Sequence, residues 1–308
     1  MPRTPPLHWL GQNARFVMAV GCFAALFLPS LSAFIRPALP LLVSMVLGLA
    51  MARLDLIDIA KDALKPKRLT RSIGLTILLM PVTACLYALL SIALPEADRN
   101  ALILLAAAPP IASSTGICLL LGYNARLALE TTLIATILTP IIGPALVAVF
   151  LPDMAPISPF DLAIRLGLII LGGIILGMSL RYILTPDRID QNKQAFDGVA
   201  AIGMVIFVIP LFDGVGATIL SNPARALWVL LLSFVFNAGV NALIQKTART
   251  TPENAGALGV FWGNRTIALY LAALPHDPQF ALFVALYQFP MYLTPLLFKP
   301  LKEDSNDT

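Results

Sequence analysis

Two short runs of polar residues interrupt apolar segments, and their residue types are suited to binding a ligand. In the first run, Pro109 and Pro110 are followed by the hydroxyl residues Ser113, Ser114 and Thr115. Each proline lacks a backbone donor and clashes with the preceding turn, so two in succession predict that the helix opens there. The freed backbone groups and the hydroxyl oxygens can then bind an ion or the polar part of a substrate.

The second run lies closer to the C-terminus and contains Asn264, Arg265 and Thr266 directly after Gly263. An arginine at the centre of a membrane segment costs at least about 2.5–3.5 kcal/mol on insertion scales, so it needs a partner or water. Irregular backbone at that depth persists only inside protein or beside a water-filled cavity. Two interrupted helices therefore predict a transport site.

The same residues also have interpretations that involve no ligand. The first run is compatible with a proline kink whose hydroxyls bond to the carbonyl four residues earlier. Glu130 is either the counter-ion of Arg265 or the partner of Arg126, which lies one helical turn before it. Thr132 and Gln288 are further polar residues in apolar segments, and they either bind a ligand or join helices.

The composition identifies the elements that position these residues. The chain has 308 residues, of which 58% are hydrophobic and 12% are charged, whereas about 25% of a soluble domain is charged. So few charges cannot cover a soluble surface, and we predict an all-α polytopic membrane protein. The net charge of +4 therefore belongs to loops and does not indicate a nucleic-acid partner. The sequence contains no metal-ligand cluster, phosphate-binding loop or catalytic motif, so we expect neither an enzyme nor a resident cofactor.

Ten charge-poor segments are long enough to cross a bilayer, which needs about 20 apolar residues per helix. If the N-terminus is cytoplasmic, the inner segments contain 16 Lys and Arg residues and the outer segments 4. This bias predicts a multi-pass protein of the inner (cytoplasmic) membrane with both termini in the cytoplasm. The predicted spans are residues 15–33, 37–53, 72–94, 100–121, 126–151, 162–183, 196–213, 225–244, 254–274 and 279–299.

The spans fall into two similar sets of five. Pro140 and Pro290 are 150 residues apart, and each is followed by a second proline, Pro144 or Pro295. Because five is an odd number, the second set must enter the membrane from the opposite side, which predicts an inverted repeat. We assign helices 1–5 to residues 1–151 and helices 6–10 to residues 152–308. Broken helices 4 and 9 should cross within a core domain of helices 3–5 and 8–10, beside a panel domain of helices 1, 2, 6 and 7.

This architecture and its motifs resemble the bile acid:sodium symporter family. The sequence APPIASST at residues 108–115 is similar to the family's Cys-Pro-Gly-Gly-Thr-Ala-Ser-Asn, with Ser114 and Thr115 at the last two positions. The sequence LALE at residues 127–130 resembles the family's Ala-Leu-Ser element, with Glu130 in place of the serine. Residues 259–265 resemble the family's Glu-x-x-x-Gln-Asn-Ser, of which Asn264 is retained.

The resemblance implies that Ser114, Thr115 and Asn264 are sodium ligands. The glutamate and glutamine that the family uses for its two sodium ions are glycines here, and Arg265 stands where the family has a serine. We hypothesise that the fixed charge of Arg265 substitutes for one sodium ion. Glu130 would then be its counter-ion or a proton carrier.

These features predict a secondary transporter that moves a small organic anion by alternating access. Its coupling would be to sodium or to protons, or absent, and its partners would be the anion and the lipid bilayer, with no evident protein partner. Two alternatives are an exporter of the auxin-efflux-carrier type and a membrane receptor that binds without transport. The predicted substrate and ion site comprises Ser113, Ser114, Thr115, Glu130, Thr132, Asn264, Arg265, Thr266 and Gln288.

Overall fold

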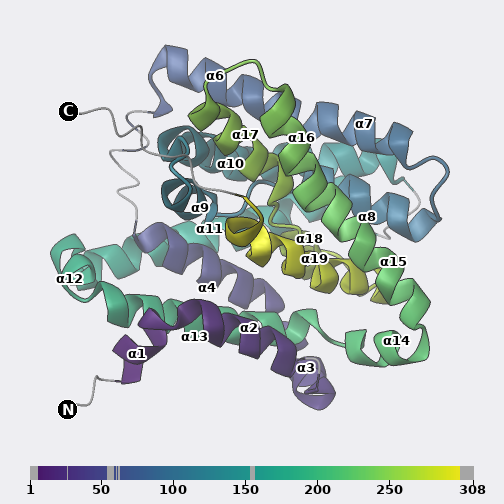
Figure 1. The fold of residues 1–308 in the computed structure, drawn as a ribbon, viewed down its shortest axis with the longest axis horizontal. Coiled ribbons are helices and arrows are strands. Elements are labelled where there is room, and N and C mark those ends of the chain that lie inside the picture. Colours follow the sequence, from purple (N-terminus) through teal and green to yellow (C-terminus); the bar gives the residue numbers. More distant parts are fainter. Residues whose placement is uncertain are drawn as a thin grey trace.

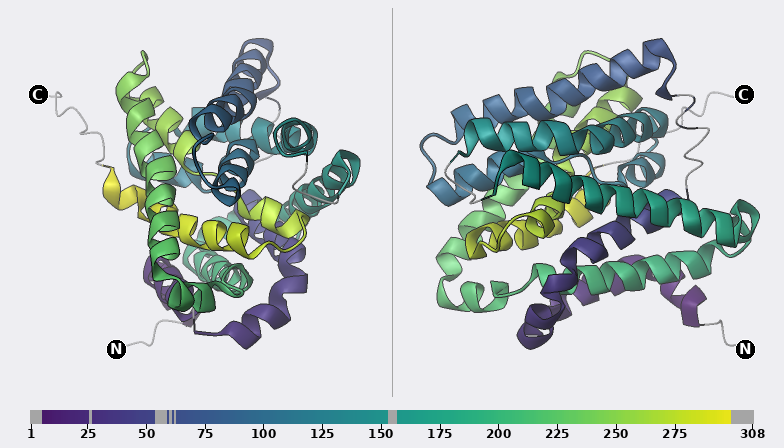
Figure 2. Two further views of the ribbon diagram at one scale, coloured as in Figure 1. Left: turned by 90° about the vertical axis from the view of Figure 1, so that its right-hand side faces the viewer. Right: turned by 180° about the vertical axis from the view of Figure 1, so that it is seen from behind.

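The computed structural model describes residues 6–25, 27–53, 59, 61, 63–152 and 157–298. These residues form helices and one isolated backbone bridge, and no strand occurs among them. The helices lie in two groups, one above the other in Figure 1, and the views in Figure 2 show the same separation. Arg3 and Lys302, which contribute to the predicted charge bias, and residues 153–156 at the predicted repeat junction lie outside the described residues.

The lower group is built around α4, which packs against α11 and α13. Helix α13 also packs against α1, α2 and α3. The helices of this group are α1 (Pro6–Gln12), α2 (Ala14–Ala25), α3 (Pro29–Ile35), η1 (Arg36–Ala38), α4 (Leu39–Ala52), α11 (Pro159–Leu184), α12 (Pro186–Gln191) and α13 (Lys193–Leu211).

The upper group contains both polar runs, the one with two prolines and three hydroxyl residues and the one with Arg265. A short helix, α14 (Val215–Ser221), connects α13 to this group. The upper group meets the lower group where α10 contacts α11 and where α18 contacts α4 and α11. Its elements are α6 (Pro66–Ile77), η2 (Leu78–Val82), α7 (Thr83–Leu90), α8 (Glu96–Ala107), α9 (Ser114–Leu120), α10 (Ala125–Phe150), α15 (Pro223–Phe234), η3 (Val235–Gly239), α16 (Val240–Thr247), α17 (Pro252–Gly263), α18 (Ala268–Ala273) and α19 (Pro278–Leu297).

Local sequence signals set where several of these helices begin. Helix α10 starts after Asn124, whose side chain accepts a hydrogen bond from the backbone N–H of Leu127. Asp277 caps α19 in the same way through the N–H of Gln279. Such caps satisfy backbone donors that have no partner within the helix. Proline at the first helical position, as in α6, α15, α17 and α19, is favoured because its missing N–H would be unpaired there.

Within the described residues, seven helices are long and apolar enough to cross a membrane. Three predicted spans are absent from these seven because each is divided into two helices: residues 15–33 into α2 and α3, residues 100–121 into α8 and α9, and residues 254–274 into α17 and α18. The interruptions at the predicted helices 4 and 9 are therefore present. The all-helical membrane fold is confirmed.

Two of the seven spans have the same construction. Residues 66–90 and residues 223–247 are each 25 residues long, and each contains a five-residue π-helix, at Leu78–Val82 and Val235–Gly239. A π-helix leaves a backbone carbonyl outside the usual hydrogen-bond pattern and is frequent at functional sites. Both π-helices lie in the upper group, which also holds the two interrupted helices.

The outer surface is suited to lipid. Leu41, Leu89, Ile141 and Leu168 lie in apolar helices and are between 64% and 71% exposed. A soluble protein seldom exposes such continuous apolar surface. These side chains fit a multi-pass membrane protein, in which lipid tails cover them.

Candidate functional site

The first interrupted helix opens at the two prolines. Helix α8 ends at Ala107, and the next residue, Ala108, has an extended backbone (φ −81°, ψ 145°). The chain becomes helical again at Ser114. Pro110 has no N–H to donate and restricts Pro109 to extended conformations, so the break falls where the sequence predicts it.

The second interrupted helix opens at Asn264, without a proline. Helix α17 ends at Gly263, Asn264 is extended (φ −113°, ψ 102°), and α18 begins at Ala268. Gly263 lies against the backbone of the neighbouring π-helix, since a Cβ atom built there would be 2.6 Å from the carbonyl oxygen of Asn237. Glycine is therefore required by close packing at the end of α17.

The two extended segments cross and pair with each other. Pro110 and Arg265 form an antiparallel bridge. The N–H of Ile111 donates to the Asn264 carbonyl at 3.0 Å, and the N–H of Thr266 donates to the Pro109 carbonyl at 2.8 Å. The Thr266 hydroxyl also donates to the Pro110 carbonyl at 3.1 Å. The backbone groups freed by each break are thus partly satisfied by the other break.

Arg265 is 1% exposed and binds only backbone carbonyl groups among the described residues. Its Nε donates to Trp262 O (3.1 Å), Nη1 to Ala108 O (2.8 Å) and Nη2 to Leu79 O (2.8 Å). Two of these acceptors lie at the C-terminal ends of α17 and α8, and the third belongs to the π-helix η2. Each helix C-terminus carries about −0.5 elementary charge. Two such ends approximately balance the guanidinium.

Glu130 is not the counter-ion of Arg265, so that hypothesis is wrong. Its buried carboxylate pairs with Arg71 (2.6 Å), Arg126 (3.1 Å) and Arg68 (3.3 Å). These arginines lie at the start of α6 and α10, whereas the donors of Arg265 are engaged at the crossing. The alternative, in which Glu130 pairs with Arg126, is the observed one. Arg68 and Arg71 join it because α6 packs against α10.

Asn264 is fixed by three neighbours within the upper group. Its Oδ1 accepts hydrogen bonds from Thr294 Oγ1 (2.9 Å) and Asn237 Nδ2 (3.2 Å), and its Nδ2 donates to Val260 O (2.9 Å). Tyr287 donates to the carbonyl of Gly263 next to it. All of these atoms are buried. The Asn264 amide therefore has its hydrogen-bonding capacity largely used within the protein.

The first break is different, because its buried hydroxyls lack partners. Ser114 Oγ, Thr115 Oγ1 and Thr132 Oγ1 are buried atoms that form no hydrogen bond with any described residue. Ser114 is 0% exposed, and α9, which carries Ser114 and Thr115, packs against α10, which carries Thr132. Gln288 Oε1 on α19 is also unpartnered, while Ser113 is exposed. Buried polar atoms without partners are uncommon and indicate a ligand or water.

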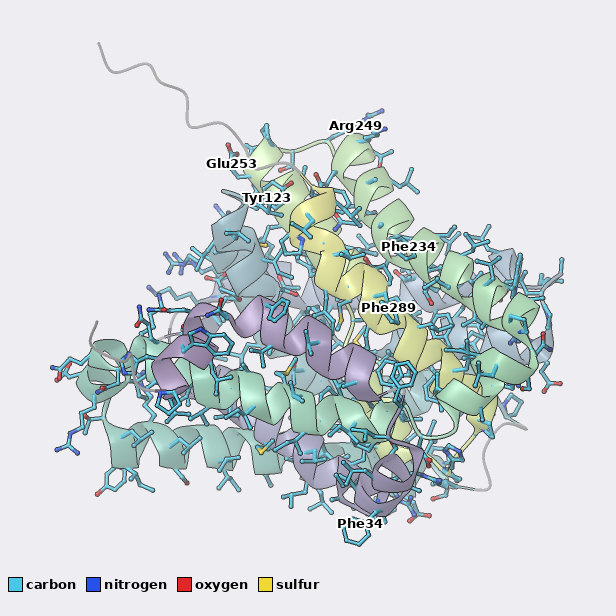
Figure 3. The ribbon with its side chains drawn as sticks, turned by 60° about the horizontal axis from the view of Figure 1, so that its bottom comes forward. Phe34, Tyr123, Phe234, Arg249, Glu253 and Phe289 are labelled. Carbon is cyan, nitrogen blue, oxygen red and sulfur yellow. The ribbon has the colours of Figure 1, made fainter. Side chains whose placement is uncertain are left out.

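Hydrogen bonds also connect α10 and α17 at the end that is predicted to face the cytoplasm. Figure 3 shows Tyr123 and Glu253 at the same end of the upper group. The N–H of Asn124 donates to the Glu253 carbonyl at 3.0 Å, and the Asn124 side chain donates to Asn254 at 2.7 Å. The start of α10 is therefore held against the start of α17, so the two interrupted helices and α10 form one packed unit.

Several residues of this site were missed by sequence reasoning. Leu79, Tyr287 and Thr294 contact Arg265, Gly263 and Asn264, yet a leucine, a tyrosine and a threonine in apolar helices have no distinctive signal. Tyr270 also donates to Ala107 O at 2.9 Å and so caps the end of α8. Only their position could have identified these four residues, since all of them lie in helices that are predicted to form the core domain.

The comparisons with known proteins agree with the motif resemblance. The family model of the sodium bile acid symporter family matches residues 39–222, more than half of the chain. The chain belongs to this family. It is a membrane transporter family, and the match includes the first interrupted helix, whereas the second and Arg265 lie beyond the matched residues.

A curated relative extends the comparison. An uncharacterized sodium-dependent transporter of Bacillus subtilis (strain 168), YocS, is 23% identical over 228 residues, which are 73% of this chain and 70% of the relative. The family match places the chain among membrane transporters, and the name of this relative agrees with that.

Proposed function

We propose that this protein is a secondary transporter of a small organic anion, with one sodium site at the first break and Arg265 in place of the second sodium ion. The observation that carries this proposal is the contrast between the two breaks. Ser114, Thr115 and Thr132 present buried oxygens without partners among the described residues, whereas Arg265, at the other break, donates to carbonyl groups of Trp262, Ala108 and Leu79.

Oxygen atoms are the ligands that hard cations prefer. The three hydroxyl groups on α9 and α10 supply neutral oxygens of that kind, so they fit a sodium ion without deprotonation. Asn264, which the resemblance also implies as a ligand, fits less well because Thr294 and Asn237 already donate to its oxygen. The relative's name describes it as sodium-dependent, which favours sodium over protons for this chain too. Glu130, paired with three arginines, offers no support for a proton carrier.

Charge balance supports the second part of the proposal. The C-terminal ends of α8 and α17 converge on the crossing, and their partial charges favour a cation. A sodium ion bound there could leave with the transport cycle, but an arginine is permanently charged and covalently attached. Arg265 would therefore hold the crossing in one arrangement and lower the number of sodium ions per cycle by one.

The proposed substrate class is based on the N-terminal ends of the second halves of the interrupted helices. Helices α9 and α18 begin at the crossing, and half-helix N-termini favour anionic groups in transporters of this kind. The family's description names bile acids, which are organic anions. Arg265 itself is not proposed to bind the anion, because its side chain already donates to three carbonyls. Candidate polar contacts are Thr266, whose hydroxyl donates to Pro110 O at the crossing, and Gln288, whose buried Oε1 has no partner among the described residues.

We infer that alternating access arises from two inverted repeats, residues 1–151 and 152–308. The support is the equal length of residues 66–90 and 223–247, with a π-helix at the same position in each. The caps Asn124 and Asp277 are 153 residues apart. The upper group would be the core domain and the lower group, except α1 and α12, the panel. The charge bias supports cytoplasmic termini and an inner-membrane location.

The deciding experiment is counterflow of a radiolabelled organic anion, such as taurocholate, in proteoliposomes with and without sodium. We expect sodium-dependent exchange in the wild type and its loss in Ser114→Ala. A receptor would bind the anion without exchange. If Arg265→Ala retains sodium-dependent anion binding that Ser114→Ala has lost, Arg265 does not replace a sodium ion. Exchange driven by a pH gradient and unaffected by sodium would instead establish proton coupling.

A further inference from the structure

A cavity lies where the two helix groups meet, away from the crossing. Its volume is about 340 Å³, and half of its lining residues come from each group. The lower group contributes Arg36, Pro37 and Pro210, and the upper group contributes Leu271 and His276. We call it the seam cavity. It lies beside α3, η1 and the start of α4, near the end of the molecule that carries α3 and α14 (Figure 1).

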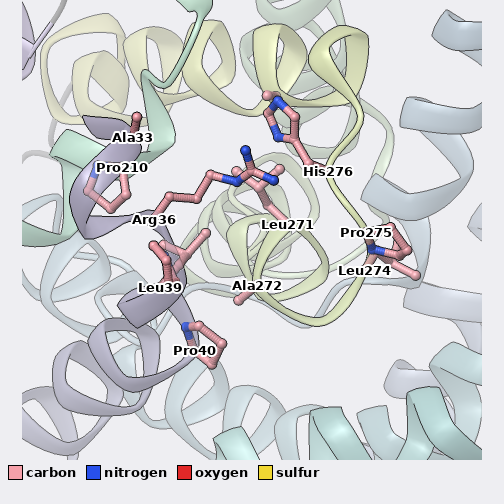
Figure 4. A pocket seen from close by; sticks show the side chains of 12 residues that line it. Ala33, Arg36, Leu39, Pro40, Pro210, Leu271, Ala272, Leu274, Pro275 and His276 are labelled. Carbon is pink, nitrogen blue, oxygen red and sulfur yellow. The ribbon is translucent and has the colours of Figure 1, made fainter. Parts of the chain in front are cut away.

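The seam cavity contains two nitrogen-bearing side chains that face each other. Figure 4 shows the guanidinium of Arg36 projecting toward the space beside His276. Among the described residues, Arg36 pairs with Asp213, from Nη1 to Oδ2 at 3.2 Å, and its side chain is 40% exposed. A guanidinium has five N–H donors. Asp213 therefore leaves donors of Arg36 directed at the cavity.

The other ten lining residues have apolar side chains: four prolines, three leucines and three alanines. The charged groups near His276 are Arg36, Asp213 and Asp277, and Arg165 of α11 closes the seam beside them by donating to Ala273 O at 3.1 Å. A cationic edge with an apolar wall matches an organic acid, whose acidic group binds the cation and whose body contacts the wall.

We propose that the seam cavity is a second anion site, which holds the carboxylate or sulfonate group of an organic anion between Arg36 and the protonated imidazole of His276. This inference rests on the proposed organic-anion transport, because it assigns the cavity to the same class of substrate. An anion bound there contacts both helix groups at once. It would therefore be held at the seam before the groups separate and the crossing becomes accessible from this end.

The pH dependence follows from His276. Burial, and the nearby charge of Arg36, hold the pKa of this imidazole below its usual value. Since the protonated form binds an anion, affinity should rise as the pH falls below about 6.5, the ordinary histidine pKa, and should be lost as the pH rises. Bound anion favours the imidazolium and so raises the pKa of His276 toward that ordinary value.

The test is protection of an introduced cysteine. Ala272, which lines the cavity, is replaced by cysteine in a Cys22→Ala, Cys85→Ala, Cys118→Ala background and labelled with a neutral maleimide. We expect benzoate and benzenesulfonate to slow labelling, and the uncharged isostere benzamide to have no effect. If Ala272→Cys does not fold, Ala33→Cys, on the facing group, is the second reporter.

Three further variants assign the protection to the cavity. Arg36→Gln should raise the benzoate concentration for half-maximal protection about tenfold or more, because a charge-assisted bond is lost. Asp213→Asn should lower it, since Arg36 is released from its carboxylate. His276→Gln should remove the pH dependence. Arg99→Gln, a charge removal in the first turn of α8 outside the cavity lining, should change nothing.

The outcomes separate this inference from the proposed function. Equal protection by benzoate and benzamide, or unchanged protection in Arg36→Gln, would overturn the seam site even if counterflow occurs. Protection that depends on Arg36, in a protein without counterflow, would establish the site and overturn the transport function on which its role as an entry site rests.

Discussion

The two interrupted helices meet at one crossing, but their buried polar side chains differ in whether they have hydrogen-bond partners. At the second break, Asn264 and Arg265 are almost fully buried, and their donors bind Val260 and three further backbone carbonyls. At the first break, the hydroxyls of Ser114 and Thr115 are buried without partners. The comparison teaches that one of two crossing breaks can be fixed by its own side chains while the other keeps buried hydroxyls that have no partner among the described residues.

The difference has a physical cause in the residue types. Arginine has a rigid fork of donors that can satisfy several carbonyls at once, whereas a serine has one hydroxyl that binds either the local backbone or a ligand. Ser91 shows the first option, with its hydroxyl donating to Tyr87 O at 2.6 Å. Ser114 lies in the first turn of α9, where no carbonyl four residues earlier is in helical position. Its oxygen therefore has no acceptor in its own helix, which is consistent with the proposed sodium site.

The largest effect on stability should come from replacing Arg265 at the second break. Arg265→Ala leaves three carbonyls without donors, and each such group costs about 1–3 kcal/mol. We therefore expect the free energy of unfolding to fall by at least about 3 kcal/mol, measured by denaturant unfolding in detergent. Arg265→Lys, which keeps the charge but not the fork, should lose less. Arg99→Ala is the control, and a wild-type stability for Arg265→Ala would contradict the comparison.

A smaller effect is expected at Asn264. Asn264→Leu removes the acceptor for Thr294 and Asn237 and one donor, so stability should fall by about 1–3 kcal/mol. Thr294→Val removes one of these bonds and should cost about 0.5–1.5 kcal/mol. Because the two residues are in contact, the losses in the double variant should be less than additive. Fully additive losses would show that their hydrogen bond does not contribute.

The smallest effect on stability should come from replacing Ser114 at the first break. Ser114→Ala removes a buried hydroxyl that has no partner, so without sodium the free energy of unfolding should change by no more than about 0.5 kcal/mol. Ser91→Ala, which breaks a hydrogen bond in an equally buried position, should lose about 0.5–1.5 kcal/mol. Sodium should raise the melting temperature of the wild type and of Ser91→Ala, but not that of Ser114→Ala. A stability loss in Ser114→Ala without sodium would mean that Ser114 is structural.

The positions of the breaks could be predicted because their causes are local. Pro109 and Pro110 interrupt a helix wherever they stand, and an apolar segment with Gly263 and Asn264 at its centre is a poor continuous helix. The π-helices could not be predicted in this way. Pro81 lies within η2, but η3 contains no proline.

The partners of the charged residues required the tertiary structure. The position of Arg265 inside an apolar span already indicates that its charge must be compensated, because a charge at that depth is costly. The sequence by itself did not determine that the compensation comes from backbone carbonyls, since every residue has a carbonyl and none is marked in the sequence. Glu130 shows the same limit. Its neighbour Arg126 could be found by helical spacing, but Arg68 and Arg71 reach it only because α6 packs against α10.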